Sequence, residues 1–528
     1  MKFTAEGKWL YGEDCYQRAD EAAGPVYDTG DGSTIAGADG AKVALAVTEE
    51  LEKNFDTGRV LVVCGSGNNG GDGIAAARLL YLAGVRTEIF LAGKMESFTE
   101  ETRIQWKIAE KYGVPIVKNP DPAEYTTIVD AIFGVGLSRN VEGHYEALLK
   151  KLDASGVPVL AVDVPSGIDA SRGRVMGTAL HARQTVTFAC AKAGLLLYPG
   201  ASYAGQVTVR DVGICPEGKT MRGSNLFSED SKGSMFRITD EDYRWLPPRN
   251  PRGNKGTFGK VLVVAGSRDM CGAAFFAAKA SLLAGAGMVR IFTEEHNRMV
   301  LQQLLPEALL TTYREDEEEE TLRRLLGQAV DWADVAAAGP GMGTGRAADR
   351  IVTALLADSG KPLVLDADGL NLLSRRKELL KQTSSACILT PHMGEMSRLT
   401  GLPVYALAED PAGCLEAFCG DYPVTCILKD ARTVTKTAGG PVFLNTRGNS
   451  GMATAGSGDV LCGIAAGFLA AGIGESRAAP LAVDFHARAG DLAAKAKGEA
   501  SLLASDILDA IPEVWKTLTK NYGNKGTA

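Results

Sequence analysis

The residues best placed to do chemistry lie in the motif GNSGMATAGSGDVLCGIAAG, residues 448–467. A loop rich in glycine, serine and threonine leads there from a β-like run, 441–446, into an apolar helix predicted over 460–470. A helix N-terminus suits a polyanion, and glycines let the backbone close on phosphate oxygens. Asp459 would repel that anion, which favours a general base or a group that orients a reacting hydroxyl. The alternative is an ordinary helix carboxylate, which stabilises by roughly 0.3–1 kcal/mol.

A second glycine-rich segment, GSGNNGGDG (65–73), follows the β-branched run 59–64 in the first half. Its glycines spell G-x-G-x-x-G from Gly65 to Gly70, and Glu88 stands where a ribose-binding acid would be found. A nicotinamide- or flavin-dependent Rossmann enzyme is therefore one interpretation of this half.

The side chains beside those glycines favour another ligand. Asn68 and Asn69, with Asp72 just beyond, form a hydrogen-bonding cluster where a dinucleotide cradle usually has small or apolar residues. An acidic group disfavours a pyrophosphate. It suits ribose or amide groups, or a monovalent cation held by carbonyl and carboxylate oxygens, and we favour this second interpretation.

Polar side chains also lie at or just after the ends of the later apolar runs in the first half. Asp130 (VDAIFGVG), Asp163 and Ser166 (VDVPSGID), and Lys192 (FACAKAG) are the residues concerned. A lone aspartate there usually caps its strand, but two beside the Asn-rich loop, at one edge of one sheet, predict a shared site. We expect Lys192 to be an acid/base partner near Asp163, although an exposed lysine is the common alternative.

The second half repeats this pattern of polar strand ends. His392 follows a proline within one of them, and Lys429 is a candidate to neutralise a nucleotide phosphate. The alternatives are a structural histidine and a surface lysine. The four segments are GPGMG (339–343), DADGLN (366–371), TPHMGE (390–395) and KDARTV (429–434).

Short apolar runs alternate with helical segments in both halves, and they must position these side chains. Runs that are continuous rather than alternating indicate parallel strands in a sheet covered on both faces, so the fold class is α/β. Ligands of such folds bind beyond the carboxyl ends of the strands. The predicted strands are 59–64, 87–91, 126–133, 157–164, 184–190, 260–265, 288–292, 335–338, 362–365, 386–389 and 424–428, with helices at 74–84 and 273–284.

The chain of 528 residues is too long for one hydrophobic core, and two domains are the natural division. The segment 216–234 is rich in polar and breaker residues, so we place the boundary there. We predict domains at 1–220 and 235–520. Residues up to 54 are predicted to be helical around a loop near 27–40, and the charge run 314–320 to be a solvated helix face.

Composition excludes several classes of protein. A formal net charge of −8 argues against a nucleic-acid partner, because phosphate backbones select basic surfaces. The apolar runs fall short of the ~20 residues of a membrane span, and the first residues do not resemble a signal peptide, so no membrane partner is expected. Ten scattered cysteines and five histidines support neither a zinc site nor a disulfide framework, and they predict a reducing cytoplasm.

Four strings in the first half together resemble the NAD(P)H-hydrate epimerase family and span most of that half. The resemblance implies a Rossmann-like three-layer αβα sandwich. One segment, TIAGADGAKVA (34–44), departs from the family's pattern. The matching strings are GSGNNGGDG, DAIFGVGL (130–137), DVPSGIDA (163–170) and TFACAKAGLLLYPG (187–200).

For the site, the resemblance implies a potassium ion bound by Asn69 and Asp130 with help from Ser166. Asp163 would contact the substrate, and Lys192 would be the family's lysine near the reaction centre. The residues implied to bind a hydrated nicotinamide dinucleotide are Asn68, Asn69, Gly70, Gly71, Asp72, Gly134, Val135, Gly136, Leu137, Ser138, Arg139 and Asn140.

The second half resembles the ribokinase-like superfamily, specifically its ADP/ATP-dependent NAD(P)H-hydrate dehydratases, which implies a ribokinase-like αβα domain. The strings are NKGTFGKVLVVAGS, GAGMV (285–289), GPGMG, DADGLN, TPHMGE and GNSGMATAGSGDVLCG. The residues implied to face the hydrated nucleotide are Ala286, Gly341 or Gly343, His392 and Asp459. Those implied to hold the adenine nucleotide are Lys429, Asp430, Ala431, Arg432, Thr433 and Gly458. The departures from the pattern are Asn254, Asp430, Ser450, Ala455 and Ser457, of which Asp430 adds a negative charge beside the nucleotide.

The two resemblances imply a nicotinamide nucleotide repair enzyme. Its first domain would interconvert the stereoisomers of NADH or NADPH hydrate, with Asp163 and Lys192 as acid/base candidates. Its second would dehydrate the S form with ADP, giving AMP and phosphate, with Asp459 as the base and magnesium on the phosphates. A homo-oligomer is expected. The rival interpretations are a ribokinase-type small-molecule kinase, the Rossmann oxidoreductase, and a non-enzymatic nucleotide-binding or scaffold role for the first half.

Overall fold

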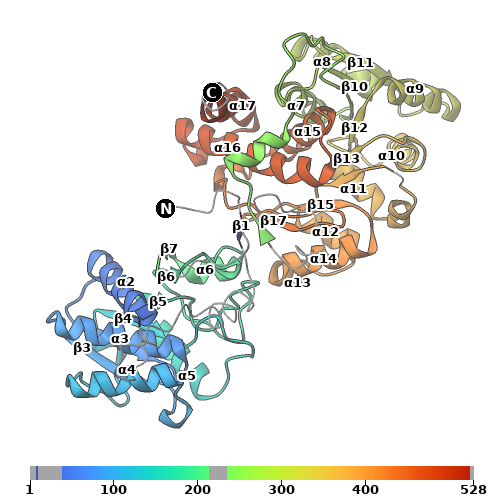
Figure 1. Cartoon of the computed structure of the whole chain (residues 1–528). Helices are drawn as coiled ribbons and strands as arrows, with labels where there is room; N and C mark the ends of the chain where they lie inside the picture. Colours follow the sequence, from blue (N-terminus) through green and yellow to red (C-terminus); the bar gives the residue numbers. More distant parts are fainter. Residues whose placement is uncertain (1–7, 10–37, 213–234, 384, 524–528) are drawn as a thin grey trace. The chain divides into compact units, whose positions relative to one another are not determined.

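The computed structural model describes residues 8–9, 38–212, 235–383 and 385–523, and it divides the chain into two compact units (Figure 1). The first unit spans 9–221, and the second spans 222–528 with residues 1–8. The predicted boundary segment and most of the predicted lead-in lie outside the described residues. Each unit is described by itself.

The first unit is built on a six-stranded sheet whose neighbours are all parallel (Figure 1). The prediction of parallel strands is confirmed, and β7, a partly exposed edge strand, is the one that the sequence patterns missed. The order brings the carboxyl ends of β2, β4, β5 and β6 side by side. In sheet order the strands are β3 (Thr87–Leu91), β2 (Val60–Cys64), β4 (Thr127–Ala131), β5 (Val159–Val162), β6 (Gln184–Phe188) and β7 (Gln206–Arg210).

Helices cover both faces of this sheet, as a three-layer sandwich requires. On one face, α2 (Ala38–Asn54), α3 (Asn68–Leu82) and α4 (Glu100–Lys111) form a core with the strands. On the other face, α5 (His144–Ala154) forms a second core. The short helix α6 (Gly200–Ala204) precedes β7.

The first helix after the glycine-rich segment begins earlier than predicted. The expected start was residue 74, but α3 begins at Asn68, so most of GSGNNGGDG is helical. A Cβ on Gly70 would collide with the carbonyl oxygen of Gly65, and one on Gly73 with the Ala131 side chain. This close packing on the strands outweighs the ~1 kcal/mol that glycine costs inside a helix.

The second unit contains an eleven-stranded mixed sheet (Figure 1). The neighbouring strands along the order β11-β10-β9-β12-β13-β14-β15 are all parallel. The pairs β15–β16 and β16–β17 are antiparallel, and β17 pairs with β8 in parallel. The predicted strands are all found within one or two residues. In order they are β1 (Lys8–Trp9), β8 (Met235–Phe236), β17 (Val442–Leu444), β16 (Val434–Lys436), β15 (Thr425–Leu428), β14 (Cys387–Leu389), β13 (Leu363–Leu365), β12 (Val335–Ala338), β9 (Lys260–Val264), β10 (Met288–Glu294) and β11 (Leu309–Tyr313).

Helices cover this sheet on both faces as well. On one face, α7 (Cys271–Leu283), α15 (Ser457–Ala470), α16 (Glu475–Lys497) and α17 (Ala504–Gly523) share a core with the strands. Helices α9 and α14 pack against the sheet from the other side (Figure 1). The remaining helices are α8 (Arg298–Leu304), α9 (Glu319–Trp332), α10 (Arg346–Asp358), α11 (Ala367–Leu373), α12 (Met393–Thr400), α13 (Val404–Glu409) and α14 (Pro411–Asp421).

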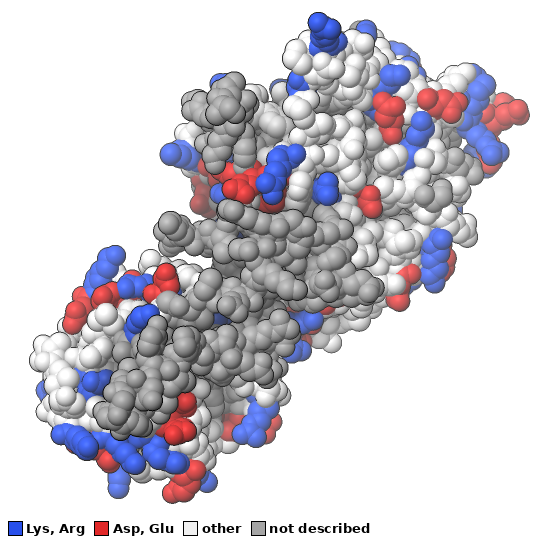
Figure 2. Space-filling model, viewed as in Figure 1, with Lys and Arg blue, Asp and Glu red and all other residues white. Residues whose placement is uncertain are grey.

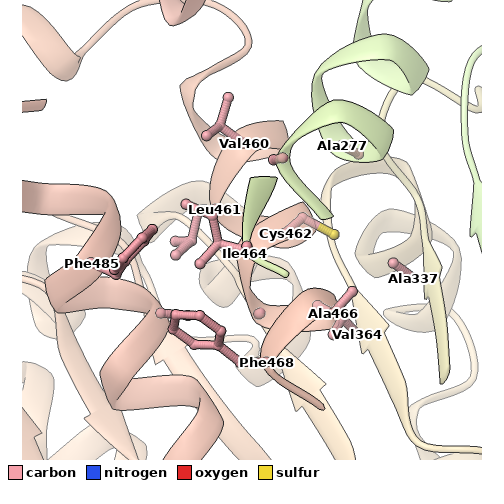
Figure 3. Packing of buried hydrophobic residues seen from close by; sticks show 14 of the residues in the cluster. Ala277, Ala337, Val364, Val460, Leu461, Cys462, Ile464, Ala466, Phe468 and Phe485 are labelled. Carbon is pink, nitrogen blue, oxygen red and sulfur yellow. The ribbon is translucent and has the colours of Figure 1, made fainter. Parts of the chain in front are cut away.

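Helix α15 is the buried centre of the second unit. Figure 3 shows Val460, Leu461 and Phe468 of α15 among side chains from α7, α16 and two strands. A Cβ on Gly463 would collide with the backbone of α7 at Ala277, so only glycine permits this approach. The helix begins at Ser457, three residues before the predicted start, which places Asp459 in its first turn as expected.

The charge run 314–320 is solvated, but it is not a helix face. Its residues are mostly exposed, and they form a turn between β11 and α9, which begins only at Glu319. The ion pair of Arg314 with Asp316 lies within that turn. Like charges crowded in sequence explain why the helix starts after most of the run.

Candidate active sites

Asp130 is a fully buried carboxylate at the end of β4. It accepts hydrogen bonds from the Ser166 hydroxyl (2.6 Å) and amide (2.8 Å) and from the Ile132 amide (3.2 Å). Burial raises its pKa to about 6 despite these bonds. Within the described residues, no lysine or arginine pairs with it. The predicted pairing of Asp130 with Ser166 is therefore present, as a buried charge without a protein cation.

Asn69 and the loop after β4 lie against this carboxylate's strand end. The Nδ2 atom of Asn69 is buried and, within the described residues, has no hydrogen-bond partner. A Cβ on Gly134 would lie 3.2 Å from Asn69 Cγ, so that loop closes directly over the asparagine. Beyond it, the segment 135–140 is partly to fully exposed, and Asn68 at the start of α3 is exposed too.

Asp163 and Lys192 form a closed, buried ion pair at the ends of β5 and β6. Lys192 Nζ lies 2.6 Å from Asp163 Oδ1 and donates to Thr187 Oγ1 (2.8 Å) and the Phe188 carbonyl (3.0 Å). Thr187 donates to the same Asp163 oxygen. Asp163 has φ +70°, a left-handed conformation that non-glycine residues hold only when their surroundings fix it. The predicted neighbours are thus in direct contact.

Asp72 begins the second turn of α3 and is half-buried. Burial, with a further contribution from the negative charge of Asp163, raises the pKa of Asp72 to about 8. The structure therefore gathers Asn69, Asp72, Asp130 and Asp163 with its lysine at one edge of the first sheet, as predicted.

Glu88 does not reach that edge. It is the second residue of β3 and is paired in register with Leu61, near the amino ends of both strands. There it accepts hydrogen bonds from Arg59 and Tyr125. A ribose-binding acid would have to stand at the carboxyl end, so the geometry contradicts the Rossmann oxidoreductase interpretation.

In the second unit, Asp459 stands in the first turn of α15 with its carboxyl half-buried. Burial and the negative charges of Asp366 and Asp368 raise its pKa to about 6, while Lys429 acts in the opposite direction. A Cβ on Gly458 would lie only 3.3 Å from Lys429 Nζ. The lysine therefore touches the helix start where an anion would be expected.

Lys429 is held by carboxylates that sequence reasoning did not select. Its Nζ donates to Asp366 Oδ1 (2.7 Å) and lies 4.0 Å from Glu395 Oε2. Thr390 also donates to Asp366. The negative charges of Asp366 and Glu395 hold the pKa of Lys429 above its usual range although burial acts to lower it. The available signal was their position at the ends of adjacent predicted strands.

His392 caps α12. Its Nδ1 accepts from the Gly394 amide (3.0 Å) and the Glu395 amide (3.4 Å), and its amide donates to the Glu395 carboxylate in return. His392 therefore acts as a helix cap, and its Nε2 atom lies 3.3 Å from Glu395 Oε1 while its side chain is still 54% exposed. An isolated parallel β-bridge pairs His392 with Lys429 and so joins the loop after β14 to the loop after β15.

The remaining predicted residues divide into two groups. Gly341 and Gly343 follow β12 with φ of +57° and +73°, and the Gly343 amide donates to Asp368. The segment 430–433 forms the turn from β15 to β16 beside Lys429. Ala286 precedes β10 and is buried at the amino edge of the sheet, so the structure does not bring it to Asp459.

Acidic and basic side chains are interspersed on the face shown in Figure 2. Of the helices that the structure describes, none is long and apolar enough to cross a membrane.

Two αβα units, each with carboxylates and a lysine at the carboxyl ends of parallel strands, define the class of the protein: a two-domain α/β enzyme. A family described as NAD(P)H-hydrate dehydratase matches residues 261–513, and one described as YjeF-related protein N-terminus matches 35–194. Bifunctional NAD(P)H-hydrate repair enzymes of Thermofilum pendens and Moorella thermoacetica are each 35% identical to it. These matches cover 87% and 90% of this chain and 88% and 91% of the relatives.

A solved structure, the ADP/ATP-dependent NAD(P)H-hydrate dehydratase of Bacillus subtilis co-crystallised with ATP and Mg²⁺, is 30% identical, with a TM-score of 0.47. That match covers 53% of this chain and 98% of the Bacillus chain. The chain belongs to the family of bifunctional NAD(P)H-hydrate repair enzymes, on the strength of relatives that match along most of its length.

Proposed function

We propose that the second unit removes water from the S form of hydrated NADH or NADPH with ADP as co-substrate, and that the first unit interconverts the R and S hydrates. The observation that carries the first part is Asp459 at the start of α15, beside Lys429 and the glycine turn. The buried Asp130 and the Asp163–Lys192 pair support the second part.

In the dehydration, Asp459 takes the proton of the ring hydroxyl while that oxygen attacks the terminal phosphoryl group of ADP. Backbone amides at the start of α15 and Lys429 stabilise the charge that develops there. AMP leaves, and the phosphorylated oxygen then departs from the ring as phosphate with help from the nitrogen lone pair. The cationic ring then loses a proton from the neighbouring carbon to the departing phosphate, which restores the C=C bond of NADH or NADPH. Release of free phosphate separates this reaction from that of a small-molecule kinase, which would keep a phosphorylated product.

The nucleotide is proposed to lie against Lys429, Gly458 and the turn 430–433. Support comes from Arg432, whose Nε atom is buried without an acceptor in the described structure while Nη1 donates to the Thr446 carbonyl. The hydrate is proposed to contact Gly341 or Gly343, His392 and Asp459. We leave Ala286 out of this set because it lies at the opposite edge of the sheet.

Magnesium would neutralise phosphate charge during the transfer. Within the described residues, no group of three or more His, Cys, Asp or Glu side chains is arranged to hold a metal ion. This fits a magnesium ion held mainly by the phosphates with one or two carboxylates, as nucleotide-bound magnesium usually is.

Potassium is proposed to bind at Asn69, Asp130 and Ser166 in the first unit. The residues fit, because Asp130 is a buried carboxylate without a protein cation among the described residues and the Ser166 hydroxyl lies 2.6 Å from it. Asn69 would contribute its amide oxygen, since its buried Nδ2 atom, unpartnered in the described structure, is a hydrogen-bond donor. A bound cation would supply the missing positive charge and fix the loop 134–140 near the hydrated ring.

We further propose a cytoplasmic homo-oligomer. The eight cysteines within the described residues are all free thiols, which supports a reducing compartment. Exposed apolar side chains at α8 and the edge strand β11, including Met299, Leu304 and Leu309, support self-association. Light scattering on the purified chain measures its mass, and a monomer at micromolar concentration would refute the proposed homo-oligomer.

Paired substitutions test the division of labour. Asp459→Ala should abolish ADP-dependent dehydration of the S hydrate and leave R/S interconversion unchanged, and Asp163→Ala should do the reverse. Both reactions are followed by chromatography of the hydrates and of NADH or NADPH. Full dehydratase turnover by Asp459→Ala would refute the mechanism.

A further inference from the structure

Asp72 is a titratable residue to which the proposed chemistry gives no proton. Its carboxyl is half-buried, yet it makes no hydrogen bond or ion pair with the described residues. Carboxyl groups withdrawn from water normally gain protein partners that compensate for it. A group left open in this way is suited to a partner that arrives from outside the protein.

The neighbouring ion pair is closed by contrast. The three N–H groups of Lys192 are matched by acceptors on Asp163, Thr187 and Phe188. Taking a proton from this lysine would leave Asp163 as a buried charge without compensation. These contacts are those of an ion pair whose two partners are held in place by their surroundings.

The pair also acts on Asp72 through space. Helix α3 packs against β2, β4 and β5, and Asp163 follows β5 directly, so both carboxyls belong to the same edge of the sheet. The negative charge of Asp163 and burial together raise the pKa of Asp72 to about 8. Asp72 is accordingly a neutral acid near pH 7 beside the carboxylate of Asp163.

We propose that Asp72 is the acid–base residue of hydrate epimerisation, and that Asp163 with Lys192 is a fixed ion pair that positions the ring. This inference rests on the proposed epimerase function of the first unit. Water adds to the dihydronicotinamide ring at the carbon beside the nitrogen, because the nitrogen lone pair stabilises positive charge there. Inverting that carbon requires one of its bonds to break and form again.

One carboxyl can run this inversion through the C–O bond. Asp72 gives its proton to the ring hydroxyl, the C–O bond breaks, and water leaves with the bonding pair. The nitrogen lone pair forms a C=N bond, and the anionic Asp163 stabilises the cationic ring. A water molecule then adds to the opposite face, the C=N electrons return to nitrogen, and the proton that it releases passes through solvent water to the Asp72 carboxylate.

The test compares Asp72→Asn with wild type in the full chain without ADP, starting from the pure R hydrate. Asparagine keeps the size of the side chain and can still donate a hydrogen bond to the ring hydroxyl, but it cannot transfer the proton. We expect kcat for R/S interconversion to fall about 100-fold or more with KM within about threefold. Asp72→Glu should recover part of the rate. Asp121→Asn, at an exposed aspartate of the same unit, should match wild type.

A second measurement examines the bond that breaks. In H₂¹⁸O, wild type should place ¹⁸O on the ring at the rate of interconversion, above the enzyme-free background. Retention of ¹⁶O, more than a tenth of wild-type kcat in Asp72→Asn, or a loss confined to KM would each overturn the inference. A wild-type chain that does not interconvert the hydrates would instead remove the epimerase function, and this inference with it.

Discussion

The two units place an aspartate in the same setting and give it opposite chemistry. Asp72 in α3 and Asp459 in α15 each stand near the start of a helix that follows a glycine-rich turn, and each faces a second carboxylate. In the first unit Lys192 is fully occupied by Asp163, whereas Lys429 reaches the start of α15 and acts on Asp459. The pKa is about 8 for Asp72 and about 6 for Asp459.

Burial raises the pKa of both aspartates, and the position of the lysine contributes to the difference between them. Lys192 is bound by Asp163, Thr187 and Phe188 and is not among the groups that shift the pKa of Asp72. Lys429 is also paired with Asp366, but it lies at the start of α15 and lowers the pKa of Asp459.

Removing the fixed pair should damage the first unit alone. Lys192→Met leaves Asp163 as a buried charge without a cation, which costs about 3–5 kcal/mol. The urea concentration at which epimerisation is lost should therefore fall sharply, while that for dehydration stays constant. Lys150→Met, at an exposed i,i+4 pair in the same unit, is the matched control and should shift neither value measurably. Equal effects of the two substitutions would contradict the role assigned to the buried pair.

Displacing α15 by a larger side chain should destabilise the second unit and leave the stability of the first unchanged. The added methyl of Gly463→Ala meets the Ala277 carbonyl and lies 2.7 Å from the Ala280 side chain, so overpacking should cost about 1–3 kcal/mol. Gly327→Ala in α9 has no atom within 4 Å of the new methyl and should stabilise by about 0.5–1 kcal/mol. Urea unfolding with dehydration as the readout measures both. A neutral Gly463→Ala would show that close packing does not fix the helix.

Removing the positive charge of Lys429 should raise the pKa of Asp459. Lys429→Met takes away the positive charge that lowers the pKa of Asp459, so the acidic limb of the dehydratase pH–rate profile should move to higher pH. KM for ADP should also rise, because the proposed phosphate contact is lost. The limb is measured under ADP saturation. If it stayed in place, Lys429 would not control Asp459.

Much of this contrast was predictable from the sequence, and the reasons for the remainder are physical. Continuous apolar runs predicted the parallel strands, and polar residues at their ends predicted that Asp130, Asp163 and Lys192 lie at one edge of the sheet, where Lys192 contacts Asp163. The start of α3 was wrong because glycines that usually break helices are here required by packing on the strands.

Charge partners were harder to foresee. Asp366 and Glu395, which hold Lys429, are separated from it in sequence, and strand order decides which residues become neighbours. The occupation of Lys192 depends on Thr187 and a backbone carbonyl, which no spacing rule reveals. The role of an aspartate at a helix start therefore cannot be predicted without the position of its lysine.

The pH dependence of the two reactions, measured on one preparation of the full chain, tests the central claim most directly. Dehydration requires ionised Asp459, so its rate should rise with pH through about 6 and then level off. Epimerisation requires protonated Asp72, so its rate should be level near neutrality and fall above about 8. Two limbs of the same sign would contradict the account, because both aspartates would then work in the same protonation state.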